Sequence, residues 1–92
     1  MSGRASEKRL RELLARVRER LSQAGTVDAD SREHLSVLMT DIDRELGRGG
    51  PSGAANTHAP RLESLAVRFE ADHPGLAEVI REVIDTLVRG GI

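Results

Sequence analysis

Residues 69–92, FEADHPGLAEVIREVIDTLVRGGI, form the most apolar segment of the chain. Asp72, His73 and Pro74 predict the start of a helix. Proline is favourable at the first helical position, because the backbone N–H that it lacks would have no hydrogen-bond partner there. A pair of glycines at 90–91 predicts its end. Between these signals, apolar residues at helical spacing cover an arc of about 180°; they are Leu76, Val79, Ile80, Val83, Ile84, Leu87 and Val88. An arc of this width needs more than one neighbouring helix.

Two helices are predicted before this segment, over residues 6–24 and 29–46. Their apolar residues share one spacing, i, i+3, i+4, i+7 and i+11, which places them on a single helical face. The first helix carries Leu10, Leu13, Leu14, Val17 and Leu21, and the second carries Leu35, Leu38, Met39, Ile42 and Leu46. A short turn between two such helices predicts an antiparallel hairpin.

Polar residues that can accept a hydrogen bond from the first helical turn lie near the start of both helices. Ser6 is predicted to cap the first helix. Thr26, Asp28 and Asp30 are alternative caps of the second helix. Asp30 with Glu33 resembles a capping box in which Asp replaces the usual Ser or Thr.

A glycine-rich stretch separates this hairpin from the rest of the chain. Residues 47–60, GRGGPSGAANTHAP, carry too little apolar surface to order themselves and predict a flexible linker. A third helix is predicted over 61–71, with one face formed by Leu62, Leu65, Ala66 and Phe69. The prediction is a single small all-α domain over residues 1–92, a helical bundle of two antiparallel hairpins, 1–46 and 61–92, joined by that linker.

The composition limits the core that one chain can build. Hydrophobic residues make up 38% of the 92 residues, and Phe69 is the single aromatic residue. A chain of this size gains modest stability from one core, so many such chains associate. We therefore predict a homo-oligomer, most simply a dimer, through the wide apolar face. The predicted interface comprises Phe69, Leu76, Val79, Ile80, Val83, Ile84, Leu87 and Val88.

Charge is unevenly distributed along a chain whose formal net charge is −1. Residues 4–20 hold seven basic side chains against three acidic ones, whereas residues 28–45 hold six acidic side chains against two basic ones. The two segments are complementary, which favours their pairing, although an exposed ion pair contributes only about 0–1 kcal/mol.

The basic residues of the first helix could also follow a phosphate backbone. They are Lys8, Arg9, Arg11, Arg16, Arg18 and Arg20. Because three glutamates are interleaved among them and the segment offers no aromatic side chain to stack a base, nucleic acid is the less favoured partner.

Residue types that carry chemistry are few and scattered. His34, His58 and His73 lack metal-ligand spacing, and the absence of cysteine excludes thiolate ligands, disulfides and thiol catalysis. Asp72 or His73 is predicted to cap the last helix rather than to form a proton relay. We predict no catalytic residue, no cofactor and no metal, and hence no enzyme. No apolar run reaches the roughly 20 residues of a membrane span and no signal-peptide core is present, so the cytoplasm is the expected compartment.

Four segments of the sequence resemble a known bacterial family. They are KRLRELLARVRERL at 8–21, QAGTVDADSREHL at 23–35, RFEADHPGLAEVIREVIDTL at 68–87 and the final Gly91–Ile92. The most specific pattern, F-E-x-x-H-P-x-L, consists of Phe69, Glu70, His73, Pro74 and Leu76. The family is a domain of unknown function, number forty-four-oh-four, of short helical proteins. The resemblance implies a bacterial cytoplasmic protein and supplies no catalytic or binding residue.

The strongest sequence signals are apolar stripes, which predict packing rather than chemistry. We therefore expect a non-catalytic protein-interaction or structural module that self-associates, with an unidentified protein as a further partner. A small regulatory nucleic-acid-binding protein that uses the basic first helix is the alternative, and a membrane is not expected to be a partner.

Overall fold

The computed structural model describes residues 2–47 and 54–90. Four helices make up almost all of that part of the chain: α1 (Ser2–Gln23), α2 (Ala29–Gly47), α3 (Ala54–Glu70) and α4 (Pro74–Gly90). No strand occurs among the described residues. The predicted all-α bundle is therefore confirmed.

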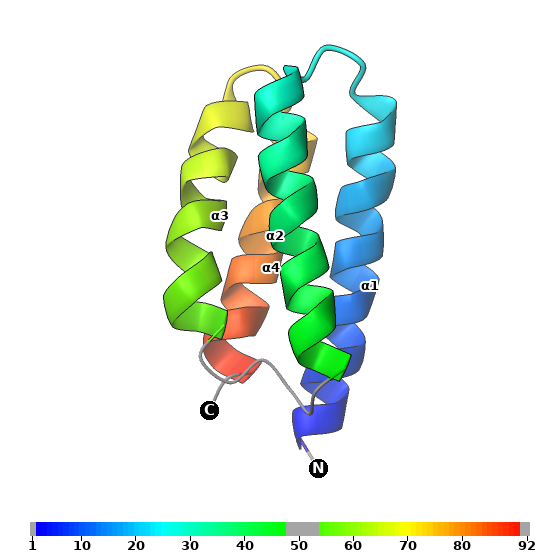
Figure 1. The fold of residues 1–92 in the computed structure, drawn as a ribbon, viewed down its shortest axis with the longest axis vertical. Coiled ribbons are helices and arrows are strands. Elements are labelled where there is room, and N and C mark those ends of the chain that lie inside the picture. Colours follow the sequence, from blue (N-terminus) through cyan, green and yellow to red (C-terminus); the bar gives the residue numbers. More distant parts are fainter. Residues whose placement is uncertain (1, 48–53, 91–92) are drawn as a thin grey trace.

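The helices form an up-down-up-down bundle in which consecutive helices are antiparallel (Figure 1). α4 packs closely against both α1 and α3, whereas α2 closes the other side of the bundle through less close contacts with the same two helices. α1 and α3 lie diagonally opposite each other, as do α2 and α4. The α1–α2 and α3–α4 turns lie together at one end of the bundle.

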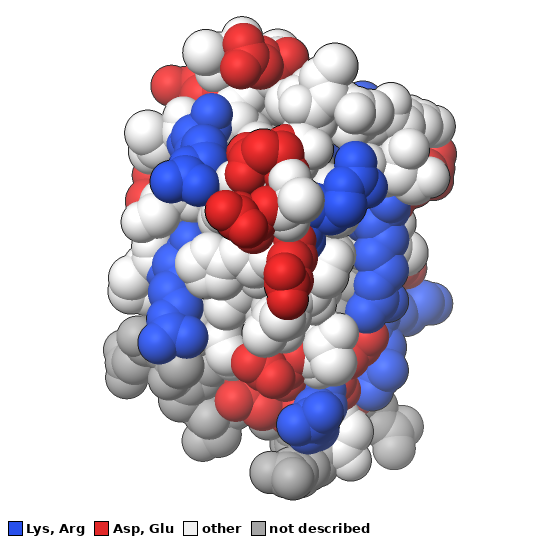
Figure 2. Space-filling model, turned by 45° about the horizontal axis from the view of Figure 1, so that its top comes forward, with Lys and Arg blue, Asp and Glu red and all other residues white. Residues whose placement is uncertain are grey.

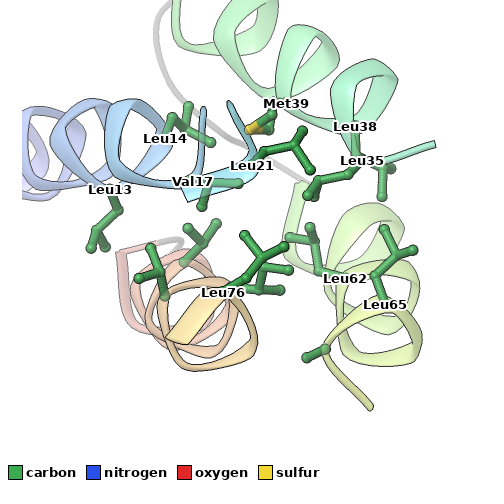
Figure 3. Packing of buried hydrophobic residues seen from close by; sticks show 14 of the residues in the cluster. Leu13, Leu14, Val17, Leu21, Leu35, Leu38, Met39, Leu62, Leu65 and Leu76 are labelled. Atoms are coloured by element: carbon green, nitrogen blue, oxygen red, sulfur yellow. The ribbon is translucent and has the colours of Figure 1, made fainter. Parts of the chain in front are cut away.

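A single hydrophobic core fills the space between the four helices. Every apolar residue predicted to line the inner faces of α1, α2 and α3 is buried in it. Figure 3 shows leucines from all four helices pointing toward one another, with Val17 and Met39 among them. The core also contains two residues that the sequence patterns did not assign to it, Val27 in the α1–α2 turn and Ala77 on α4. The apolar stripes therefore meet in one shared core.

α4 buries most of its wide apolar face within the chain. α1 covers one side of the arc and α3 covers the other. The residues of the predicted interface that are buried as a result are Phe69, Leu76, Val79, Ile80, Val83 and Leu87. Ile84 is partly buried against the core, and 52% of the surface of Val88 is exposed. Of the residues predicted to form an interface with a second chain, Ile84 and Val88 are thus the ones that keep exposed surface.

The ends of α1 and α4 differ in how well the sequence located them. α1 begins at Ser2, so Ser6 lies inside the helix and does not cap it. α4 begins at Pro74, as predicted, and extends to Gly90. The second glycine of the predicted end, Gly91, lies outside the described residues.

α3 begins earlier than the sequence predicted. It starts at Ala54, so residues 54–60 are helical although their composition assigned them to the linker. His58 in this segment is buried, and its burial supplies a packing contribution that a composition-based prediction does not include. The rest of the predicted linker, residues 48–53, lies outside the described residues.

The shared core makes a strong prediction for two neighbouring residues of α2. Replacing Leu38, which is fully buried, by alanine should lower the free energy of unfolding by about 2–5 kcal/mol, because it removes buried methyl groups and leaves a cavity. Val37→Ala, at an exposed position beside it, should change stability by no more than about 0.5 kcal/mol. Urea denaturation followed by circular dichroism measures both values. Equal losses in the two variants would contradict this placement of α2.

Pro60 distinguishes the observed start of α3 from the predicted one. Pro60 lies inside α3, where a proline removes one backbone hydrogen bond and lowers the free energy of unfolding by about 3 kcal/mol. Proline also restricts the unfolded chain, and this effect raises the free energy of unfolding by up to about 1 kcal/mol. Pro60→Ala should therefore increase helicity and stabilise the protein by about 2 kcal/mol.

The control is the same substitution at Pro74, the first residue of α4, where proline is favourable and Pro74→Ala should not stabilise. If α3 instead began at residue 61, Pro60 would precede the helix and both substitutions would behave alike. Thermal unfolding followed by circular dichroism separates these outcomes.

Candidate functional site

The outward face of α4 carries a groove. The groove is open to solvent and has a volume of about 580 Å³. It runs along α4 from Pro74 to Thr86, with Ala77 in its lining and with Arg9 of α1 and Glu70 of α3 at its edges. Since α1 and α3 flank α4, this face is the one that no other helix of the bundle covers.

Ion pairs border the groove on both sides. Toward α1, Arg9 lies 3.8 Å from Glu82, and toward α3, Arg81 lies 2.5 Å from Glu70. All four side chains are between 41% and 58% exposed. Exposed pairs of this kind contribute only about 0–1 kcal/mol each, so the groove's charges can change partners at little cost.

Exposed apolar surface adjoins these charges. Val88 follows Ile84 by one helical turn, so the two side chains lie on neighbouring positions of the same face of α4. Val88 is one of three large hydrophobic residues that the described part of the chain exposes; Val37 on α2 and Val67 on α3 are the others, with 51% and 58% of their surfaces accessible. Only Val88 belongs to the interface that the sequence predicted.

The basic row of α1 lies on the surface, as Figure 2 shows for the Lys and Arg side chains along the right-hand side of that view. Three of its six residues contact acidic side chains: Arg9 contacts Glu82, Arg11 lies 3.1 Å from Glu7, and Arg18 lies 2.8 Å from Asp43. The last pair joins the basic α1 to the acidic α2. Acidic partners therefore neutralise part of the row that the sequence offered for phosphate binding.

A polar network fixes the turn between α1 and α2. Asp28 is the cap of α2, because its Oδ2 accepts a hydrogen bond of 3.0 Å from the backbone N–H of Ser31. Ser31 is buried, and its hydroxyl accepts a hydrogen bond of 3.0 Å from the Arg68 guanidinium on α3. The hydrogen bonds from Ser31 hold the pKa of Asp28 below its usual value, and the Arg68 charge acts in the same direction. Asp30, the alternative that resembled a capping box, is exposed in the first turn of α2.

Two further contacts tie this end of the bundle together. The Arg32 guanidinium of α2 donates hydrogen bonds to the carbonyls of Leu21 and Ala24, at 3.2 and 2.9 Å, and so satisfies the C-terminal end of α1. The Thr26 hydroxyl lies 3.1 Å from Nε2 of His73, which joins the α1–α2 turn to the α3–α4 turn. The His73 carbonyl accepts the first hydrogen bond of α4, so His73 occupies the cap position by its backbone.

The other two histidines lie far apart. His34 is exposed on α2, whereas His58 is buried on α3, with Nε2 3.4 Å from Oε1 of Glu45. Among the residues that the structure describes, no three His, Asp or Glu side chains gather closely enough to hold a metal ion. None of the described helices is both long and apolar enough to cross a membrane.

The capping geometry predicts a pH dependence in acid. Because the folded protein lowers the pKa of Asp28 below 3.8, ionised Asp28 stabilises the fold above that pH, and this stabilisation is lost as the pH falls through the folded-state pKa. Asn can accept the same hydrogen bond without a charge, so Asp28→Asn should remove this part of the acid-induced fall in Tm. Thermal unfolding between about pH 5 and about pH 2 measures the effect.

Asp30→Asn is the matched control, because Asp30 lies in the same turn without the capping contact. It should leave the slope of Tm against pH closer to that of the wild type than Asp28→Asn does. If the slope were flatter in the Asp30 variant than in the Asp28 variant, Asp28 would not be the aspartate that caps α2.

Comparison with known proteins identifies a family but no characterised relative. The model of a family described as a domain of unknown function, DUF4404, matches residues 10–92. No curated protein and no solved structure matches the chain. The matched range includes all of α2, α3 and α4 and the part of α1 that contributes to the core. The chain therefore belongs to the DUF4404 family.

Proposed function

We propose that this protein is a non-catalytic interaction module that self-associates, most simply as a dimer, through the outward face of α4. The observation that carries the proposal is that α4, whose outward face is covered by no other helix and carries the open groove, also exposes 52% of the surface of Val88. An exposed apolar side chain on a helix that also carries a groove with charged edges is typical of surfaces that bind another protein.

A second copy of the chain is the favoured partner because the face carries charges of both signs. Arg81 and Arg89 lie on it together with Glu78 and Asp85. A surface with both signs can complement itself across a two-fold axis, whereas a surface of one sign needs a partner of the opposite sign. An unidentified protein that covers the same face is the second kind of partner we expect.

Nucleic-acid binding by α1 remains the alternative function and has weaker support. Arg9, Arg11 and Arg18 already contact acidic side chains. Phe69, the single aromatic residue, is buried between helices and so offers no surface on which a base could stack. The bacterial origin and cytoplasmic location implied by the family resemblance likewise remain predictions.

The three exposed valines provide a matched test of self-association. Val88→Asp should lower the molar mass from that of a dimer toward that of a monomer, because it places a charge in an apolar contact. Val37→Asp and Val67→Asp, at equally exposed sites on α2 and α3, should leave the mass unchanged. Light scattering coupled to size exclusion, from about 10 to about 500 μM, measures the mass.

A charge at Ile80, within the predicted interface, would not test self-association. Ile80 is completely buried within the chain, so Ile80→Asp should unfold the protein whether or not it forms a dimer. The molar mass of the wild type is measured first. A monomer mass at every concentration, with a Tm that does not change with concentration, would show that the proposed self-association is wrong.

A further inference from the structure

We propose that two copies of the chain meet through an antiparallel contact between their α4 helices, in which Val88 of each copy enters a hole on the other. This inference rests on the proposed self-association and specifies its geometry. It is drawn from the spacing of the groove-lining residues, the position of the exposed valine and the order of charges along α4.

The groove contains the four positions that form a hole for a side chain of a second helix. Such a hole is made by residues i, i+3, i+4 and i+7 of one helix. Pro74, Ala77, Glu78 and Arg81 have this spacing, and all four line the groove. Only 1% of the surface of Ala77 is exposed, so a side chain that enters the hole contacts mainly Pro74, Glu78 and Arg81.

Val88 lies on the same side of α4 as this hole. At 100° per residue, its direction from the helix axis differs by only about 30° from the mean direction of the four hole residues. A two-fold axis across α4 can therefore place Val88 of one copy over Ala77 and Glu78 of the other, and the reverse contact follows from symmetry. Each copy supplies one projecting side chain and one hole.

The charges along α4 favour this register over its neighbours. When Val88 lies opposite Glu78 of the second copy, Arg81 lies opposite Asp85, and Arg89 lies within one residue of Glu78. Symmetry doubles each of these attractions. A slide of one helical turn places Arg81 opposite either Arg81 or Arg89 of the second copy, so like charges meet in both neighbouring registers.

The existing ion pairs of the single chain do not oppose this arrangement. Arg81 contacts Glu70, and Asp85 lies 3.2 Å from Arg89. The Asp85 and Arg89 side chains are 60% and 80% exposed, and exposed pairs rearrange readily. Arg81 has several donors in its planar guanidinium, so it can contact Glu70 and the Asp85 of the second copy together.

Charge reversal tests the register. Asp85→Arg should weaken the dimer at least about 10-fold, because it places Arg81 opposite a second basic residue twice in each dimer. Combining it with Arg81→Asp should restore the dissociation constant to within about 3-fold of the wild type, because opposite charges face each other again. Glu63→Arg, at an exposed site on α3, is the control and should have no effect. Sedimentation equilibrium measures the three constants.

Disulfide trapping tests the contact itself in a chain that has no cysteine of its own. Glu78→Cys combined with Val88→Cys places two thiols about 15 Å apart along one helix, so a disulfide between them must join two chains. This double variant should form a covalent dimer in a glutathione buffer, and either single variant should form much less. Glu78→Cys combined with Val37→Cys, on the diagonally opposite α2, is the control.

The outcomes separate the geometry from the self-association on which it rests. A wild type that is monomeric at every concentration overturns both. A wild-type dimer that Asp85→Arg does not weaken, or that the double reversal does not restore, overturns the α4 register and leaves self-association standing. A dimer in which the 78/88 pair forms no more disulfide than the 78/37 control overturns the α4 contact in the same way.

Discussion

Burial of the wide apolar face of α4 is the constraint on which the rest of the structure depends. A single neighbouring helix covers an arc near 100°, about half of what α4 presents. α1 and α3 therefore pack on its two sides, and α2 closes the space that remains between them. The result is a four-helix bundle in which α4 makes the closest contacts. Because the chain has a single aromatic residue, its core consists almost wholly of aliphatic side chains from all four helices.

The helices and their buried faces could be predicted because helical periodicity is a local property of the sequence. Every stripe residue of α1, α2 and α3 is buried, as is most of the α4 face. The helix that covers α4 could not be predicted in the same way. The short turn between matching apolar stripes, supported by complementary charge, suggested that α1 pairs with α2. An ion pair between Arg18 and Asp43 does join those helices, but α1 packs more closely on α4. Apolar area outweighs exposed charge in this choice.

Sequence patterns placed the bounds of α2 and α4 within one residue but missed the starts of α1 and α3. They also located the polar contacts poorly, because these contacts join residues far apart in the sequence. Asp28 rather than Asp30 caps α2 where Arg68 of α3 reaches the hydroxyl of Ser31. His73 meets Thr26 from a turn 47 positions earlier in the chain. The candidate site shows the same limit: the sequence identified the apolar residues of α4, but only the packing of α1 and α3 shows that Ile84 and Val88 retain exposed surface.

Native-state hydrogen exchange tests most directly whether the four helices share one core. If they do, the best-protected amides of α1, α2, α3 and α4 should exchange through one common opening, with a free energy equal to that of global unfolding. The measurement applies to the whole chain at a single protein concentration, with backbone amides resolved by NMR. A shared core would be contradicted if the α1 and α2 amides exchanged together with an opening free energy more than about 1 kcal/mol below that of the α3 and α4 amides. The two hairpins would then be separately stable.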